Sequence, residues 1–415
     1  MTEHLLGLTA LGAVGVLFTI LARRWPAARA LLLIAFSARA LAALFHFYIA
    51  PLPDGLQDAT TFERVAWEWA QGSLADTLGH FTGPSGYIIS WILAVFYSIF
   101  DRSPLLGQAL SVGFGTGAVF LGWHLARLLW DERAARVAGW AMALFPTLIQ
   151  YHALILREAY IHFFLVVALI GVVLWARQKQ RFGGVILALA GFTAASFFHG
   201  AVAVGALAFL VILTVRSFSE LFSGVYQTGR IPFYALTFLV AGALALPAIW
   251  GANIQLPSLG TFERATDREV ILDQSLRRSH GGAAYPDWVQ PQSLEEFPYK
   301  APAQIFYFVF SPFPWDIRGI HQLMGLVLDS VFYIAIFFLL WRLRKTLWRD
   351  PASRYVLIIL LGLTVVYAFG TANFGTGIRH RAKMVIGFLA LVAPKIPRLV
   401  VRSRAIEPES PRRTK

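Results

Sequence analysis

The chain lacks cysteine altogether and contains few charged residues for its length. None of its 415 residues is Cys, and only 14% are Asp, Glu, Lys or Arg, whereas soluble globular proteins carry about 25%. The missing cysteine excludes disulfides, thiolate metal sites and cysteine nucleophiles. The low charge, together with 57% hydrophobic residues and a mean hydropathy of +0.61, argues strongly against a soluble enzyme. Most of the chain is therefore expected to lie in lipid.

Long apolar runs predict the fold class, which is an all-α polytopic integral membrane protein. A bilayer core of about 30 Å requires roughly 20 helical residues, and about eleven stretches approach that length when flanking residues contribute. These predicted transmembrane helices cover residues 5–22, 31–50, 105–126, 135–150, 158–176, 184–198, 201–215, 231–250, 322–341, 355–371 and 384–397. The first run lacks the basic leader and small-residue cleavage site of a signal peptide, so we interpret it as a helix.

The positions of the basic residues predict the orientation. Most of the 36 Lys and Arg fall in one set of loops, namely 23–30, 127–136, 177–183, 216–230, 342–354 and the tail from Lys395. The positive-inside rule places these loops in the cytoplasm, with the N-terminus outside and the C-terminus inside. The net charge of +13 then reflects topology, and nucleic acid is not an expected partner. The expected location is the inner (plasma) membrane of a bacterium.

Two long segments are expected outside the membrane. Residues 85–100 look like a span, but counting them as one would move the later basic loops outside. We therefore interpret 51–104 as a first external loop with juxtamembrane helices. This interpretation depends on whether the number of preceding spans is odd or even, and a span at 85–100 stays open as an alternative. Residues 251–321 form a second long external loop with a proline-broken helix. The predicted membrane-embedded domain is 1–398, and 399–415 is a polar tail expected to be disordered.

Acidic residues at two predicted external positions are candidates for acid–base chemistry. Asp58 and Asp54 follow the second span, where a carboxylate can accept a proton from an acceptor hydroxyl; alternatively, both cap a loop helix. Arg157 and Glu158 interrupt the apolar run LILREAYIHFFL at a helix start. The helix dipole favours an acid such as Glu158 at this position, which would make its role purely structural. However, a charged residue at membrane depth usually faces a cavity or a partner.

Basic residues in GTANFGTGIRHRAKM form the strongest candidate anion site. Arg379, His380 and Arg381 stand at a predicted external helix start, where free N–H groups and Arg side chains suit a phosphate; the alternative is contact with lipid headgroups. Arg39 lies inside the second span and either holds a carboxylate or extends its charge to the interface. The His and acid spacings predict no metal site, although a divalent cation between Asp58 and Glu158 stays open as an alternative.

The order of these motifs resembles a known family. PLPDGLQDATTFERVAWEWAQG, GHFTGPSGYIISWILAVFYSIF, GWHLARLLWDERAARVAG and ALFPTLIQYHALILREAYIHFFLVVAL follow one another over about residues 30–215. This order is similar to the GT-C superfamily of polytopic glycosyltransferases, in particular the protein mannosyltransferase and aminoarabinose-transferase-like group. The family's His-Pro-Pro is matched only by His80 with Pro84, and the helix at 5–22 is atypical of it.

The resemblance implies a GT-C-like bundle and a glycosyltransferase that uses a sugar donor on a polyprenyl phosphate or diphosphate. It implies that Asp58 activates the acceptor and that Glu158 is the second acid. Apart from the resemblance, the candidates for binding substrate are Arg157, Arg379, His380, Arg381, His80, Arg39 and Asp54. The acceptor is a glycan, a lipid or a protein. Two alternatives remain, a polysaccharide polymerase or O-antigen ligase type of enzyme and a transporter or lipid flippase. Because charged residues collect at one predicted face, the sequence favours an enzyme.

Overall fold

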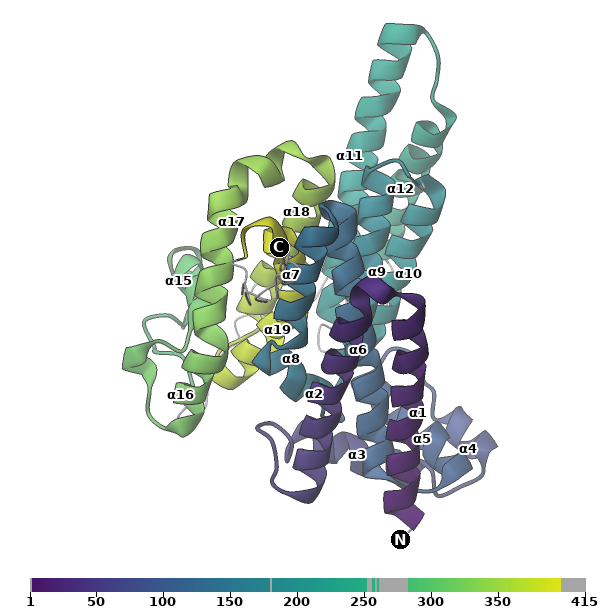
Figure 1. Cartoon of the computed structure of the whole chain (residues 1–415). Coiled ribbons are helices and arrows are strands. Elements are labelled where there is room, and N and C mark those ends of the chain that lie inside the picture. The colour runs from purple at the N-terminus through teal and green to yellow at the C-terminus, as the bar shows by residue number, and fades with distance from the viewer. Residues whose placement is uncertain (1, 180, 252–255, 258–259, 261–282, 397–415) are drawn as a thin grey trace, which may run out of the picture.

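The computed structural model describes residues 2–179, 181–251, 256–257, 260 and 283–396. These residues form helices and connecting turns, and within the described ranges the only β-type pairings are two isolated bridges. Figure 1 shows a bundle whose longer helices run roughly side by side. The all-α architecture predicted from the apolar runs is confirmed for this part of the chain.

Eight helices in the described part are long and apolar enough to cross a membrane, so the protein is an integral membrane protein. They are built on α1 (Thr2–Arg24), α2 (Arg29–Tyr48), α6 (Pro104–Leu129), α9 (Glu158–Ala176), α10 (Arg181–Phe198), α11 (Ala203–Thr228), α17 (Val331–Arg349) and α18 (Pro351–Phe369). Short turns extend three of them at their N-terminal ends: η1 (Pro26–Ala28), η2 (Gly200–Val202), and α16 (Ile320–Gly325) with the π-helical turn η4 (Leu326–Ser330).

The other helices are shorter or carry more charge. They are α3 (Asp58–Trp69), α4 (Leu74–Gly79), α5 (Ile88–Phe100), α7 (Glu132–Ala143), α8 (Pro146–His152), α12 (Phe233–Gly251), α15 (Phe297–Phe310) and α19 (Phe374–Val392), with the short turns η3 (Pro314–Asp316) and η5 (Ala393–Lys395). α5 has 13 residues, which at 1.5 Å per residue is shorter than a bilayer core. It packs against α3 and α4, and all three lie at the end of the bundle where α1 begins (Figure 1).

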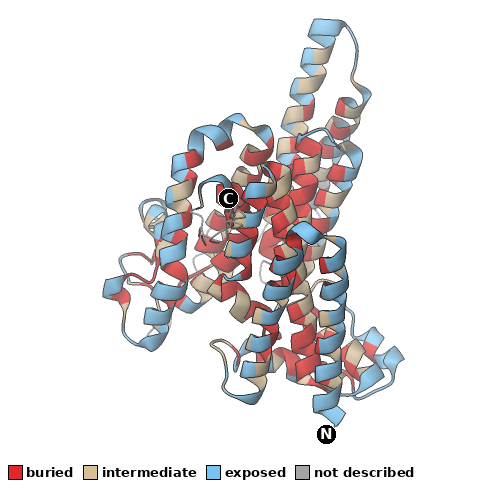
Figure 2. Cartoon of the chain, viewed as in Figure 1, coloured by how far each residue is buried: buried red, intermediate tan, exposed pale blue. Residues whose placement is uncertain are grey.

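The centre of the bundle is α9, which is apolar on every side and packs against α6, α10, α18 and α19. Figure 2 shows the buried residues running through this interior, while α1, α17 and the tip of α11 are largely exposed. The α9–α10 contact is backbone to backbone: a Cβ added at Gly171 would lie 2.3 Å from the amide nitrogen of Ala188, and one at Gly191 would lie 2.5 Å from that of Ala168. Small residues allow this close approach between membrane helices.

Three of the eleven predicted spans are not among the eight candidate spans of the described part, namely 135–150, 384–397 and 231–250, the last of which corresponds to α12. The run 135–150 is not one helix, because α7 ends at Ala143 and α8 begins at Pro146; proline lacks the N–H that would continue the helix and clashes with the preceding turn. The span predicted at 384–397 begins ten residues earlier, at Phe374, where the side chain of Asn373 accepts a hydrogen bond from the amide nitrogen of Thr376 (2.8 Å). Asn is a favoured residue at this capping position.

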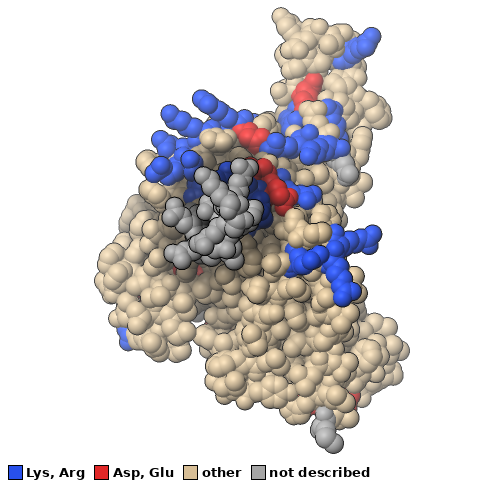
Figure 3. Space-filling model, in the orientation of Figure 1, with Lys and Arg blue, Asp and Glu red and all other residues tan. Residues whose placement is uncertain are grey.

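Lys and Arg side chains are distributed unevenly. On the face in Figure 3, they gather at the end of the bundle that holds the α1–α2 and α17–α18 turns, whereas few lie near the N-terminus. The loop between α2 and α3 lies at this second, less basic end (Figure 1). On the face shown, the basic turns of the described part gather at one end of the bundle, as predicted; the basic tail beyond residue 396 lies outside the described residues.

Candidate functional site

Three distant segments of the chain meet at the end of the bundle that holds the α2–α3 loop. Asp58 is the first residue of α3, Glu158 is the first residue of α9, and Arg379 lies in the second turn of α19. Acids in the first turn of a helix are favoured by the partial positive charge at its N-terminus, so the local sequence suits both acidic positions. The tertiary fold then brings both carboxylates to one guanidinium.

Arg379 bridges the two acids. Its Nη1 lies 2.5 Å from Asp58 Oδ2, its Nε lies 2.7 Å from Glu158 Oε1, and its Nη2 lies 3.4 Å from Glu158 Oε2. One helical turn later, Lys383 Nζ lies 3.3 Å from Glu158 Oε1. Residues four apart share a face of a helix, so α19 presents two cations to one carboxylate.

The cluster extends from the surface into the interior. The side chain of Asp58 is 51% exposed, that of Arg379 is 14% exposed, and those of Glu158 and Lys383 are 1% exposed. A buried charge is tolerated only when it is paired, and Glu158 is paired twice. Asp58 is thus the carboxylate of this set that a molecule from solvent can reach. Glu158 is buried and pairs with Arg379 and Lys383 in the interior.

Asp54 adds a third acid beside the cluster. It has a positive φ of 62°, a conformation that Asp adopts more readily than most residues. Tyr151 Oη donates a hydrogen bond to Asp54 Oδ2 (3.3 Å), and Gln150 Nε2 donates to the carbonyl oxygen of Pro53 (3.0 Å). Burial raises the pKa of Asp54, and the positive charge of Arg379 partly offsets this. Asp54 therefore holds a proton more readily than an ordinary aspartate.

Arg157 is bound differently from the other cations of the site. Its Nη1 donates to the carbonyl oxygen of Phe198 (3.3 Å), and its guanidinium lies over the ring of Phe62, 5.4 Å from the centroid. Its Nε has no hydrogen-bond partner among the described residues, and the ion pairs of the described part include none with Arg157. Burial lowers its pKa, while the neighbouring charge of Glu158 acts in the opposite direction. The guanidinium therefore has hydrogen-bonding capacity that the described protein does not use.

Two histidines lie next to the cluster. The rings of His199 and His380 are 5.3 Å apart, and each contacts the ring of Tyr367. His380 Nδ1 also lies 2.9 Å from the hydroxyl of Thr371. Of the two, the sequence predicted His380 as a candidate for binding substrate, and the structure brings it near Lys383 through Tyr367, whose ring is 5.3 Å from Lys383 Nζ.

Described residues of the second long loop contact the turns beside this site. The amide nitrogen of Gly200 donates to the carbonyl oxygen of Pro257 (2.8 Å). At the other end of the loop, the amide nitrogen of Tyr285 donates to the carbonyl oxygen of Ala372 (2.9 Å), just before α19. Most of the loop between these contacts lies outside the described residues, as does the predicted tail at 399–415.

Arg381 does not belong to the cluster, contrary to the sequence-based prediction. It is buried and paired with Asp329; its Nη1 donates to the carbonyl oxygens at the end of α15, including that of Ser311 (2.6 Å), and its Nη2 donates to Ser330 Oγ (3.0 Å). Residues two apart on a helix point about 200° apart, so Arg381 and Arg379 face different neighbours. In this structure it donates hydrogen bonds to backbone carbonyl oxygens at the end of α15.

Arg39 has protein partners in the interior, whereas the sequence-based prediction that it binds substrate stays a prediction. It is fully buried, its Nη1 and Nη2 donate to the carbonyl oxygens of Ala143 (3.0 Å) and Met142 (3.2 Å), and its Nε donates to His152 Nδ1 (2.9 Å). The two carbonyls belong to the last residues of α7, which the break before Pro146 leaves without helical partners. Arg39 therefore caps a broken helix.

His80 lies apart from the cluster. It follows α4, it is exposed, and its ring stacks on Trp69 with centroids 5.1 Å apart and an interplanar angle of 9°. The prediction that it binds substrate gains nothing from this position.

The described residues contain no group of three His, Asp or Glu side chains arranged to hold a metal ion. Arg379 occupies the space between Asp58 and Glu158 where a divalent cation was considered.

Comparison of the chain with family models, with curated proteins and with solved structures found no match. What the site can do is therefore argued from its geometry, in which three acids and three cations gather at one end of a membrane bundle.

Proposed function

We propose that the protein is a membrane glycosyltransferase that moves a sugar from a polyprenyl-phosphate-type donor to an acceptor hydroxyl. The observation that supports this most is the single cluster formed by Asp58, Glu158 and Arg379, with Asp54 and Arg157 beside it. Such a transfer requires a carboxylate to accept a proton and a cation to stabilise the departing phosphate. This cluster supplies both kinds of group at one end of the bundle.

The proposed reaction inverts the sugar carbon. The acceptor oxygen attacks the anomeric carbon, and its proton passes to the carboxylate of Asp58. The bond between that carbon and the donor phosphate oxygen breaks, and its electron pair stays on the phosphate. Arg157 is suited to the leaving phosphate because its Nε has no partner among the described residues, and Arg groups bind phosphate strongly. Arg379 holds Asp58 and Glu158 in place.

The site is proposed to face the outside of the membrane. The basic turns gather at the opposite end of the bundle (Figure 3), and the positive-inside rule assigns such an end to the cytoplasm. Since the sequence has no Cys, single introduced cysteines report orientation without background. Gly79→Cys should react with an impermeant maleimide in intact cells, and Gln227→Cys, at the end of α11, should react only after lysis. The reverse pattern contradicts the orientation.

Turnover by carboxylate variants tests the chemistry. Asp58→Asn should lose about 10²–10⁴ in rate on a polyprenyl-phosphate-linked sugar, because a general base contributes that factor, and donor binding should be nearly unchanged. The matched control is Glu68→Gln, which removes an exposed carboxylate that is on the same helix and pairs with Arg64. Near-normal turnover by Asp58→Asn would reject Asp58 as the base, and Asp54→Asn measured in parallel shows whether its neighbour has that role.

A second enzymatic function has one observation in its favour. His199 and His380 lie together beside the cations of the cluster, and a polymerase or O-antigen ligase type of enzyme acts on a lipid diphosphate, which carries more charge to neutralise. Comparing turnover on monophosphate-linked and diphosphate-linked donors separates the two functions. If the protein is a polymerase or O-antigen ligase type of enzyme, His380→Gln should reduce turnover on the diphosphate donor selectively.

A further inference from the structure

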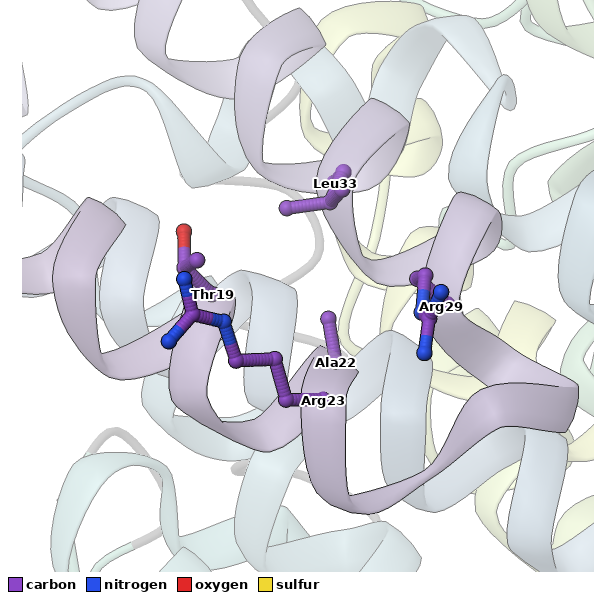
Figure 4. Close-up of a pocket in the computed structure, with 5 residues that line it drawn as sticks. All are labelled: Thr19, Ala22, Arg23, Arg29 and Leu33. Atoms are coloured by element: carbon purple, nitrogen blue, oxygen red, sulfur yellow. The ribbon is translucent and has the colours of Figure 1, made fainter.

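A pocket lies between α1 and α2, at the turn that joins them. It has a volume of about 350 Å³ and is lined by Thr19, Ala22, Arg23, Arg29 and Leu33. Figure 4 shows Arg23 reaching along α1 towards Thr19, with Arg29 and Leu33 on α2 across the pocket. This turn lies at the opposite end of the bundle from α3, which begins at Asp58 (Figure 1).

The turn that carries the pocket is held firmly in place. Trp25 packs edge-on against Phe120 and Trp123 of α6, with ring centroids 5.6 and 6.1 Å away, and the guanidinium of Arg127 lies 5.6 Å from the Trp25 ring. The turn beside the pocket is therefore packed against α6.

The two arginines of the pocket are not neutralised by the described protein. Both are exposed, and no hydrogen bond or ion pair joins either guanidinium to a side chain in the described ranges. The Thr19 hydroxyl donates to the carbonyl oxygen of Gly15 (2.8 Å), so the guanidiniums supply the donors. An anion with several oxygens matches two such groups.

The surface next to the pocket is apolar. Leu17 and Ile20 on α1 are 51% and 55% exposed, and Leu33 and Ile34 on α2 are 37% and 42% exposed. In a membrane protein, such side chains on a lightly buried hairpin face acyl chains. An anionic headgroup held by the two arginines would thus have its hydrocarbon tails beside a matching surface, a combination that a soluble anion or a nucleic acid does not use.

We propose that this pocket binds the phosphate of an anionic glycerophospholipid, with the acyl chains lying along the exposed apolar faces of α1 and α2. Basic pockets between membrane helices are suited to such headgroups. Each arginine near an anionic headgroup contributes about a fivefold factor in affinity, and the pair contributes roughly thirtyfold. This proposal does not depend on the reaction at the opposite end of the bundle.

Native mass spectrometry of the full-length protein tests the proposal. The protein is titrated with phosphatidylglycerol and, separately, with phosphatidylcholine. We expect a tight phosphatidylglycerol site that weakens roughly thirtyfold in Arg23→Gln/Arg29→Gln, with phosphatidylcholine unaffected. The control Arg133→Gln/Arg136→Gln removes two exposed arginines of α7 outside the pocket and should bind as the parent protein does.

Two further measurements keep the test decisive. Arg23→Lys/Arg29→Lys keeps the charge that supports insertion but removes the planar fork, so it should fold and lose only severalfold in affinity. Inorganic phosphate at millimolar concentration should not displace the lipid; if it does, the pocket is a site for free anions and the proposal is wrong. Equal binding of phosphatidylglycerol by the parent protein and both pocket variants would also overturn it.

Discussion

Replacement of Arg379 by Gln should separate the buried part of the charged cluster from its exposed part. The Arg379–Glu158 pair joins side chains that are 14% and 1% exposed, whereas Asp58 is 51% exposed. Breaking a buried pair by removing one partner costs about 3–5 kcal/mol, but an exposed pair contributes about 0–1 kcal/mol. Because Lys383 still neutralises Glu158, we expect the free energy of unfolding to fall by about 3 kcal/mol.

Two double-mutant cycles measured by reversible unfolding in mixed micelles check this reasoning. Arg379→Gln with Glu158→Gln should give a coupling energy of about 2–3 kcal/mol, and Arg379→Gln with Asp58→Asn should give less than about 1 kcal/mol. The exposed pair Arg64 and Glu68 on α3, whose side chains are 63% and 54% exposed, serves as the control and should show at most about 0.5 kcal/mol. A larger coupling to Asp58 than to Glu158 would refute the argument from burial.

Three further predictions concern single groups. Arg381→Met should lower the free energy of unfolding by about 3–5 kcal/mol, because it leaves the buried carboxylate of Asp329 without its ion-pair partner. Adding Asp329→Leu should restore much of this loss. A double variant no more stable than the single one would contradict the pairing. Arg39→Gln should cost at least about 2 kcal/mol, since each buried group left unsatisfied costs about 1–3 kcal/mol, while KM for the donor should stay unchanged if Arg39 does not contact it. Asp54 has a pKa raised by burial, so the folded protein binds more protons than the unfolded chain just above the ordinary value of 3.8, and stability should fall as pH rises through that window. Asp54→Asn should remove this dependence in unfolding measured from about pH 4 upward, and an unchanged slope would show that Asp54 does not titrate there.

The apolar runs predicted the fold class because membrane helices are specified by length and composition, which are local properties. The departures arose where one residue overrides composition. Pro146 divides a run that hydropathy alone joins, and Asn373 starts α19 earlier than its apolar residues do. Both signals were present in the sequence as a helix breaker and a helix cap, but hydropathy reads neither: the apolar run continues across Pro146, and the polar and basic residues after Asn373 hide the first turns of α19.

The sequence also indicated which residues of the site to consider. Asp58, Glu158 and Arg379 stood out as charges beside long apolar runs, and the structure brings these three together. Lys383 was missed as a partner of Glu158, although its spacing from Arg379 would have placed both on one face of a helix that begins at Phe374.

The presence of membrane helices and the candidate acids follow from the sequence alone, because each depends on residues close together in the chain. The pairing of charges depends on the tertiary structure. Arg379 and Arg381 are two residues apart and look equivalent in the sequence, yet one binds Asp58 and Glu158 while the other binds Asp329. The helix turns them to different sides, and only the packing of α3, α9 and η4 around α19 decides which carboxylate each side meets.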